Sequence, residues 1–384
     1  MTSKYIETLN RIFDKATIGK LKVVTPEGQE LVFSGNNQGP SCDITIHDWT
    51  TLDMVKKRGD IGLGEAYHLG MWGSSDTADF LTYCSLNLDQ INNAGDANFL
   101  NRIFFYFYNH FVRLNTKYGS KKNILEHYDI GNDFYQLWLD PSMTYSSAIR
   151  KNPEDSLEQA QLNKYDRIIE KLDLRGKKVL EIGCGWGGFA DRASSLEADV
   201  TGITISDKQY EYAKKRLQDR AKILTQDYRD LQGQFDRIVS IEMFEAVGEK
   251  YWPKYFQQIK KLLVDGGRAI VQTITIADDA FAQYRKNSDY IRHHVFPGGM
   301  LPSRDIFCKE AAKAGLSVVE VFEFGSDYAW TLEQWRQEFN KKRQQLMDMR
   351  YSLPFLRSWE FYFCISIAGF KSQRTNVMQV ELKN

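Results

Sequence analysis

The stretch KVLEIGCGWGG, residues 178–188, decides the fold predicted for most of this chain. Its first residues form a mainly apolar run that indicates a buried strand, and this run leads directly into glycines and then into a helical pattern. Gly183, Gly185 and Gly187 allow the backbone to turn sharply and to approach a ligand without a Cβ clash. A strand, a glycine turn and a helix in this order predict a nucleotide-binding βαβ unit.

Helical and extended patterns alternate on both sides of this turn. Expected helices cover residues 156–173, 187–196, 206–218, 250–263, 304–314 and 331–349. Expected strands, rich in Val and Ile, are KKVLEIG, DVTGITI, KILTQD, DRIVSIEMF, RAIVQTITI and SVVEVFEFG. Strands separated by helices of ten or more residues predict an α/β fold with a doubly wound, mainly parallel, Rossmann-like sheet.

The N-terminal part of the chain has a different pattern. Residues 5–16 predict an amphipathic helix, and the short strands KLKVV, ELVF and CDITIH follow it. Residues 55–92 have helical patterns at both ends around the glycine-rich middle GDIGLGEAYHLGMWG. The 384 residues are therefore expected to form a smaller α+β domain, residues 1–118, and a larger domain, residues 119–384.

Residues 101–122 combine an aromatic-rich helical pattern with a basic tail. One interpretation is a core or dimer helix followed by a solvated linker. The other is a surface that contacts a bilayer, with aromatic rings at headgroup level and Lys and Arg near anionic lipid. We therefore expect the smaller domain either to dock on a membrane or to pair two subunits in a homodimer.

Composition excludes several classes of protein. Lys+Arg and Asp+Glu are equal at 50 each, so bulk attraction to phosphate is absent and no nucleic-acid partner is expected. The five cysteines show no metal-site spacing, which predicts reduced thiols and no metal centre. No secretory leader and no run of about 20 apolar residues is recognisable. These features predict a cytoplasmic protein that meets a membrane only peripherally, at its inner face.

Two features of the glycine turn narrow the choice of ligand. Glu181 lies two residues before the first glycine, where a carboxylate can reach an amino group. The spacing of the dinucleotide fingerprint is not met, because Gly187 and Gly188 come too early. A ligand without a pyrophosphate fits better, and S-adenosylmethionine is the leading candidate. Thr204–Gln209 and Asp227–Arg229 follow the next two strands, where ligands of such sheets bind, and the latter pair an Asp with an aromatic ring suited to adenine.

Longer motifs carry a family resemblance. They are HYDIGNDFYQLWLDPSMTYSSA (127–148), VLEIGCGWGGFA (179–190), TGITIS (201–206), QDYRDL (226–231), FDRIVSIEMFEAVG (235–248), VFPGGMLPS (295–303) and FGSDYAWTL (324–332). Over about residues 120–370 the chain resembles the cyclopropane fatty acid synthase family, which includes the mycolic acid cyclopropane synthases. The resemblance implies a methyltransferase that uses S-adenosylmethionine to alkylate a cis double bond of an acyl chain, usually in a membrane phospholipid.

The resemblance also implies which residues hold the methyl donor. Tyr145 and Ser146 would contact its methionine end, and Tyr128 would close over the site. The remaining implied contacts are the cradle Glu181, Gly183, Cys184, Gly185, Trp186 and Gly187, the ribose side Thr204, Ile205 and Gln209, and the adenine side Asp227, Tyr228 and Arg229.

The family's chemistry implies a second group of residues. Attack by the double bond leaves a carbocation, and ring closure then needs a base. The resemblance implies that this base is a bound bicarbonate, held by a Glu, a Tyr, a His, a Cys and backbone groups. The matching residues here are Glu245, Tyr328, Gln272 in place of the His, Ser147 in place of the Cys, and the backbone of Ile274. Glu242, three residues before Glu245, is a spare carboxylate that could assist or replace the bicarbonate.

The departures at Ser147 and Gln272 leave the product open. Retained proton loss from the added methyl gives a cyclopropane, whereas loss from a neighbouring carbon gives a methylene or methyl-branched chain and would call for a reductase partner. An inactive lipid-binding protein and a methyltransferase for RNA or small molecules are further alternatives. His293 and His294 are interpreted as surface or packing residues, because no neighbour in sequence completes a metal or acid–base set.

Overall fold

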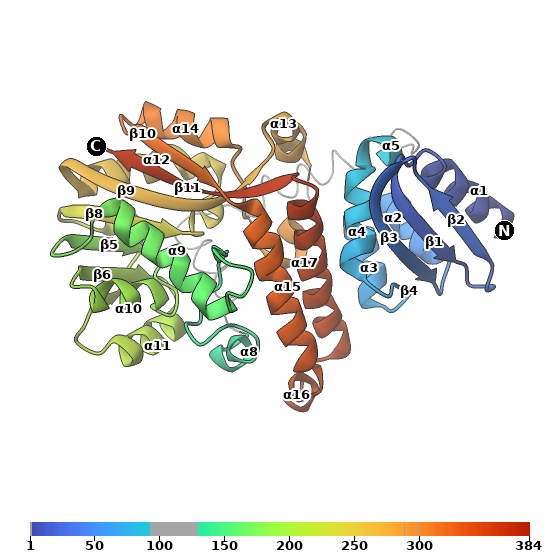
Figure 1. The fold of residues 1–384 in the computed structure, drawn as a ribbon, viewed down its shortest axis with the longest axis horizontal. Helices are drawn as coiled ribbons and strands as arrows, with labels where there is room; N and C mark the ends of the chain where they lie inside the picture. Colours follow the sequence, from blue (N-terminus) through green and yellow to red (C-terminus); the bar gives the residue numbers. More distant parts are fainter. Residues whose placement is uncertain (1, 93–129, 288, 297) are drawn as a thin grey trace. The chain divides into compact units, whose positions relative to one another are not determined.

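The computed structural model describes residues 2–92, 130–287, 289–296 and 298–384 (Figure 1). The described chain divides into two compact units. The first takes in the N-terminal residues through Asn92 together with Lys286–Val295 and Phe339–Arg374, and the second takes in the rest. The predicted boundary after residue 118 lies outside the described residues, and two later segments that the sequence placed in the larger domain belong to the first unit.

The first unit contains a four-stranded sheet of order β2-β1-β3-β4. Its strands are β1 (Ile18–Val24), β2 (Glu30–Ser34), β3 (Asn37–Ile46) and β4 (Trp72–Gly73). Its helices are α1 (Thr2–Phe13), α2 (Thr50–Arg58), α3 (Asp60–His68), α4 (Thr77–Leu86), α5 (Leu88–Asn92), α16 (Arg343–Asp348) and α17 (Leu353–Lys371). The apolar helix α17 packs against α3 and α4, which explains why this late segment joins the N-terminal elements.

The glycine-rich middle of residues 55–92 contains the helix α3, which Gly59 separates from α2 and which a turn and β4 follow. Gly62 and Gly64 lie inside α3. A Cβ at Gly62 would lie 2.1 Å from the Met54 carbonyl oxygen, and one at Gly64 would lie 2.4 Å from the Tyr290 ring. The glycines therefore serve close packing, and tertiary contacts outweigh their low helix propensity of about 1 kcal/mol each.

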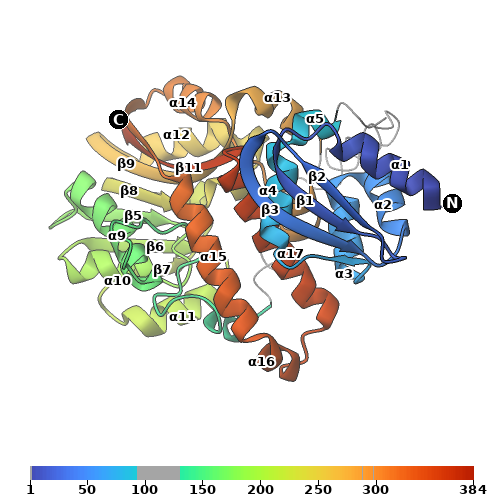
Figure 2. The same ribbon diagram turned by 45° about the vertical axis from the view of Figure 1, so that its right-hand side comes forward.

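The second unit is built on a seven-stranded sheet of order β10-β11-β9-β8-β5-β6-β7. Its strands are β5 (Lys178–Ile182), β6 (Asp199–Thr204), β7 (Lys222–Thr225), β8 (Phe235–Ile241), β9 (Leu263–Ile276), β10 (Ser317–Glu323) and β11 (Thr375–Lys383). Neighbours from β9 to β7 pair in parallel, whereas β11 is antiparallel to both β9 and β10. Figure 2 shows β9, β8, β5, β6 and β7 one below another in this order. The predicted α/β class with a mainly parallel sheet is confirmed.

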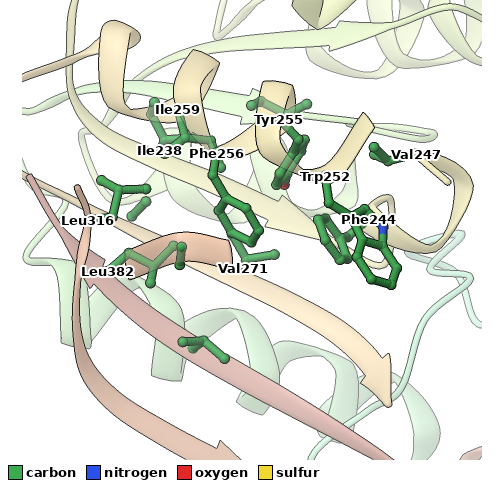
Figure 3. Packing of buried hydrophobic residues seen from close by; sticks show 14 of the residues in the cluster. Ile238, Phe244, Val247, Trp252, Tyr255, Phe256, Ile259, Val271, Leu316 and Leu382 are labelled. Carbon is green, nitrogen blue, oxygen red and sulfur yellow. The ribbon is translucent and has the colours of Figure 1, made fainter. Parts of the chain in front are cut away.

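Helices alternate with these strands. They are α8 (Asn132–Gln136), α9 (Leu157–Leu172), α10 (Gly188–Ser195), α11 (Asp207–Leu217), α12 (Trp252–Leu262), α13 (Asp278–Lys286), α14 (Arg304–Lys313) and α15 (Gly325–Lys341). Side chains alternate along a strand, so Val179 of β5 joins the core formed with α9–α11, and Leu180 joins the core formed with α12 and α14. Figure 3 shows the second core, where Trp252 and Tyr255 of α12 lie near Phe244.

Both faces of the sheet are thus covered, and ligand sites are left to the strand ends, as in other open α/β sheets. None of the described helices combines the length and the apolar character that crossing a membrane requires. Glu181 follows Leu180 and points to the Val179 face, so its carboxylate is buried on the α9 side of the sheet.

Candidate active site

The glycine turn follows β5 directly. The backbone N–H groups of Gly183 and Cys184 both donate to the Ile203 carbonyl of β6, at 3.0 and 2.9 Å, which fixes the turn against the neighbouring strand. Gly183, Gly185 and Gly187 have φ angles of 82°, 51° and 83°, which L side chains adopt only at a cost. A Cβ at Gly185 would meet nothing within 4 Å, so the backbone there borders open space where a ligand can approach closely.

Glu181 lies beside this turn. Its side chain is buried, and Oε2 has no hydrogen-bond partner among the described residues. Burial raises the pKa of the carboxyl to about 8, and the charge of Lys164 opposes this rise. A buried carboxylate oxygen without a partner, next to an open glycine turn, fits a ligand that brings hydrogen-bond donors, as S-adenosylmethionine does.

The next two strand ends carry the other predicted cofactor residues. Thr204 ends β6, and its hydroxyl donates to Gln209 Oε1 at 2.8 Å, while Ile205 between them is half-buried. After β7, the Asp227 carboxylate accepts hydrogen bonds from the backbone N–H of Arg229 at 2.9 Å and from its guanidinium at 2.8 and 2.5 Å. The Tyr228 ring packs 5.5 Å from that of Tyr255. The Asp227 carboxylate, which the sequence analysis assigned to adenine, is therefore hydrogen-bonded to Arg229.

Aromatic rings surround Tyr145. Its ring centroid lies 5.6 Å from Trp138, 5.2 Å from Trp335 and 5.6 Å from Tyr135, and Trp186 lies 5.1 Å from Tyr135. The indole N–H of Trp186 donates to the side chain of Asn132 at 2.8 Å. Trp138 and Trp335 were not predicted for the site, since their sequence pattern does not differ from that of core tryptophans. Aromatic rings packed in this way exclude water, and aromatic π faces can stabilise a cation.

Three of the predicted site residues donate hydrogen bonds to the side chain of Glu242. Its Oε1 accepts the backbone N–H of Ser147 at 2.8 Å and the Gln272 amide at 2.7 Å. Its Oε2 accepts the Tyr328 hydroxyl at 2.5 Å. The Ser147 hydroxyl instead donates to the Ala148 carbonyl at 3.1 Å. Burial raises the pKa of Glu242, and these hydrogen bonds and the Lys164 charge act in the opposite direction.

Glu245 has a separate set of partners. Its Oε1 accepts the backbone N–H of Ile274 at 2.6 Å and the Thr273 hydroxyl at 3.0 Å, and its Oε2 has no hydrogen-bond partner among the described residues. Burial, and then the nearby charge of Glu242, raise the pKa of Glu245 to about 8. The five predicted catalytic residues therefore form two hydrogen-bonded groups. Ile274 is hydrogen-bonded to Glu245, whereas Ser147, Gln272 and Tyr328 are hydrogen-bonded to Glu242.

Lys164 of α9 is a site residue that the sequence analysis missed. Its Nζ is fully buried and donates to the Ser146 hydroxyl at 2.6 Å and to Gln161 Oε1 at 2.7 Å. Burial lowers its pKa to about 7, and the charges of Glu242, Asp140 and Glu181 oppose this change. Lys164 lies on the apolar stripe of a predicted helix, and a lysine in that position was the signal that could have revealed it.

Two predictions fall elsewhere. Tyr128 lies outside the described residues. His293 and His294, interpreted as packing or surface residues, lie in the first unit with Glu65, and one ligand atom from each of the three is within 4.8 Å of the others. The Arg58 guanidinium pairs with Glu65 and lies 3.2 Å from His293 Nε2, so a cation already shares this cluster.

The strand order, the open glycine turn and the buried carboxylate beside it are the features expected of an S-adenosylmethionine-dependent methyltransferase, the class to which the comparisons assign the chain. The family model described as mycolic acid cyclopropane synthetase matches residues 115–380, and the chain belongs to this family. The resemblance stated from the sequence motifs is thus confirmed, as is an enzyme of the cyclopropane-fatty-acyl-phospholipid synthase type.

Three similar proteins illustrate the relationship. The cyclopropane-fatty-acyl-phospholipid synthase of Escherichia coli K12 is 35% identical over 360 residues, covering 90% of this chain and 88% of that protein. The tuberculostearic acid methyltransferase UfaA1 of Mycobacterium tuberculosis is 33% identical over 339 residues, covering 85% and 79%. The solved mycolic acid cyclopropane synthase CmaA1, complexed with SAH and CTAB, has a TM-score of 0.64 at 27% identity and covers 69% of this chain and 98% of that one.

Proposed function

We propose that this protein transfers the methyl group of S-adenosylmethionine to the cis double bond of an unsaturated acyl chain in a membrane phospholipid and forms a cyclopropane. The observation that carries the proposal is the pair of carboxyl groups, Glu242 and Glu245, which are withdrawn from solvent and follow the end of β8, the neighbour of the strand that leads into the cofactor turn. Methyl transfer to an oxygen or nitrogen does not call for two buried carboxylates, whereas carbon alkylation followed by proton loss requires a base in a dry site.

The residues around the site support the demanding first step. An alkene is a weak nucleophile, so alignment with the bound methyl donor must provide much of the acceleration. The open backbone at Gly185 and the carboxylate of Glu181 would hold the donor, which supplies the electrophilic methyl group. Tyr145, Trp138 and Trp335 would keep water from the cationic chain carbon and stabilise it through their rings.

Phospholipid is proposed as the form of the substrate because the Escherichia coli relative, matched over 88% of its length, is a cyclopropane-fatty-acyl-phospholipid synthase. Access would then require peripheral binding at the inner face of the membrane. Residues 101–122, which suggest this binding, lie outside the described residues, and pairing into a homodimer through the same region is the alternative role. No nucleic-acid partner is proposed for a chain with zero net charge.

A second product is favoured by the two departures from the family pattern. The Gln272 amide contacts Glu242, while the Ser147 hydroxyl is turned to the Ala148 carbonyl and only the Ser147 N–H contacts Glu242, so the side chains around the proton acceptor differ from the His and Cys of the family pattern. A relative of similar identity is named a tuberculostearic acid methyltransferase, which shows that relatives differ in product. Proton loss from a neighbouring chain carbon would give a methylene or methyl-branched chain, and a reductase partner would complete the latter.

Product structure tests the proposal. Full-length protein is incubated with methyl-labelled S-adenosylmethionine and vesicles of cis-unsaturated phospholipid, and the released acyl chains are studied by mass spectrometry and proton NMR. A cyclopropane and a methylene chain both gain one CH₂, so the NMR spectrum must distinguish them. Ring protons at the former double bond support the cyclopropane, an exocyclic methylene supports the second product, and unlabelled acyl chains contradict both.

A further inference from the structure

We propose that Glu242 is the catalytic base of this enzyme and occupies the place that the resemblance assigns to bicarbonate. The proposal rests on the proposed function, because a base is required only if an acyl carbon is alkylated. It adds a role for a residue of the chain itself and predicts turnover without bicarbonate.

The hydrogen-bond donors around Glu242 carry the argument. Tyr328, Gln272 and Ser147 are the positions that the family would direct to bicarbonate, and all three donate to the two oxygens of Glu242, at 2.5, 2.7 and 2.8 Å. Bicarbonate and a side-chain carboxylate present similar planar pairs of acceptor oxygens. The carboxylate thus satisfies three of the four donors by which a bicarbonate would be recognised, and the fourth, the Ile274 N–H, donates to Glu245.

The backbone at Glu242 provides an independent observation. Glu242 has a φ angle of 49°, a region that costs a non-glycine residue roughly 1–2 kcal/mol. Its N–H donates to the Gln272 carbonyl at 2.9 Å, so the strand beside it holds the residue in this conformation. Backbone strain of this kind persists at functional sites, where the surroundings place a side chain that an unstrained residue could not place.

Electrostatics distinguish Glu242 from Glu245. Two buried carboxyls close together do not both ionise readily. The charged form of Glu242 is favoured by three donors and by Lys164, whereas the pKa of Glu245, with two donors, is raised to about 8. Burial raises the pKa of both carboxyls, but the donors and Lys164 oppose the rise at Glu242, so Glu242 is the better placed of the two to be ionised and to accept a proton.

The step balances without another reactant. The π electrons of the alkene form the bond to the methyl carbon while the carbon–sulfur bond breaks and its electron pair stays on sulfur. The neighbouring chain carbon is left with the positive charge. Glu242 Oε2, which has a lone pair beyond the one that accepts the Tyr328 hydroxyl, takes a proton from the added methyl, and the released C–H pair closes the ring. No oxidant or reductant is consumed.

The test measures label transfer from S-adenosylmethionine to cis-unsaturated phospholipid vesicles in buffer freed of carbon dioxide, with and without added bicarbonate. The variants are Glu242→Gln, which keeps the shape, and Glu242→Gly, which suits the positive φ and exposes the three donors. Glu197→Gly is the matched control, because Glu197 also has a positive φ, of 66°, but pairs with Arg175 at the surface. Thermal unfolding and S-adenosylmethionine binding verify that each variant is folded.

We expect the wild type and Glu197→Gly to vary less than twofold with bicarbonate, and Glu242→Gln to lose at least about 100-fold in kcat, the scale of a lost general base. In Glu242→Gly, added bicarbonate should restore activity at least tenfold. A bicarbonate-dependent wild type, or Glu242→Gln within twofold of it, would overturn the role of Glu242 while leaving the proposed function intact. A wild type that labels no unsaturated acyl lipid would overturn the proposed function and this role with it.

Discussion

Replacing Glu245 by Gln should change how the stability of the protein depends on pH. Gln is close in shape to the protonated carboxyl, and its carbonyl oxygen can accept the same hydrogen bonds from Ile274 and Thr273 that Glu245 Oε1 accepts. The free energies of unfolding of wild type and variant should therefore be similar where Glu245 is protonated in the folded chain. They should diverge where the buried wild-type carboxyl must ionise.

The magnitude follows from the raised pKa. The pKa of Glu245 is about 8 in the folded chain and 4.5 for an unperturbed carboxyl, so the folded chain binds more protons than the unfolded one between these values. The stabilisation is thus fully present below about pH 4.5 and is lost as pH rises through about 8. At about 1.4 kcal/mol per pH unit, the wild type should lose about 3 kcal/mol relative to Glu245→Gln between pH 5 and pH 8.

The assay is urea unfolding of both full-length proteins, in parallel, at several pH values from 5 to 8. The quantity compared is the difference between the two proteins at each pH, because contributions of other groups such as Glu181 largely cancel in it. The difference should grow steadily in favour of the variant as pH rises. Parallel stability curves, or a growing advantage of the wild type, would refute the assignment of a protonated buried Glu245.

Further predictions concern the cofactor turn, the buried lysine and the membrane. Gly183→Ala should destabilise the folded protein by about 1–3 kcal/mol more than Gly185→Ala does. A Cβ at residue 183 would lie 2.8 Å from the Met243 side chain, whereas a Cβ at residue 185 would meet nothing within 4 Å. Calorimetry of both variants checks this, and equal losses of stability would contradict it. Lys164→Met removes a charge that favours ionised Glu242, so the acidic limb of the pH–rate profile should move to higher pH, and an unmoved limb would contradict the coupling. Replacing the Phe104/Phe105 pair with Ala should weaken co-sedimentation with anionic vesicles several-fold, and unchanged sedimentation would remove the membrane role of residues 101–122.

The parallel part of the sheet was predictable because buried parallel strands are continuous apolar runs between helices. Strand β11 was not predicted. Its sequence TNVMQVELK mixes polar and apolar residues, yet it is buried almost throughout because it pairs with both β9 and β10. That pairing joins segments far apart in the chain, and a local pattern does not contain this information.

The site was predictable only in part. The family resemblance implied one site for Ile274 and Glu245, and the structure brings them into contact because β8 and β9 are neighbours in the sheet. The partners of Glu242 were not predictable, because they depend on its positive φ and on the short 3₁₀ helix Phe244–Ala246 that follows. For Lys164 the apolar stripe of the helix indicated burial, but the carboxylates that surround its charge are evident only in the folded structure.

In the proposed reaction the enzyme alkylates a carbon of an unsaturated acyl chain. The most direct measurement follows transfer of the methyl label from S-adenosylmethionine into vesicles of cis-unsaturated phospholipid and into matched vesicles of saturated phospholipid. Label is expected in the acyl chains of the unsaturated lipid alone. Label in the saturated lipid or in the headgroup, or no label in either lipid, would contradict it.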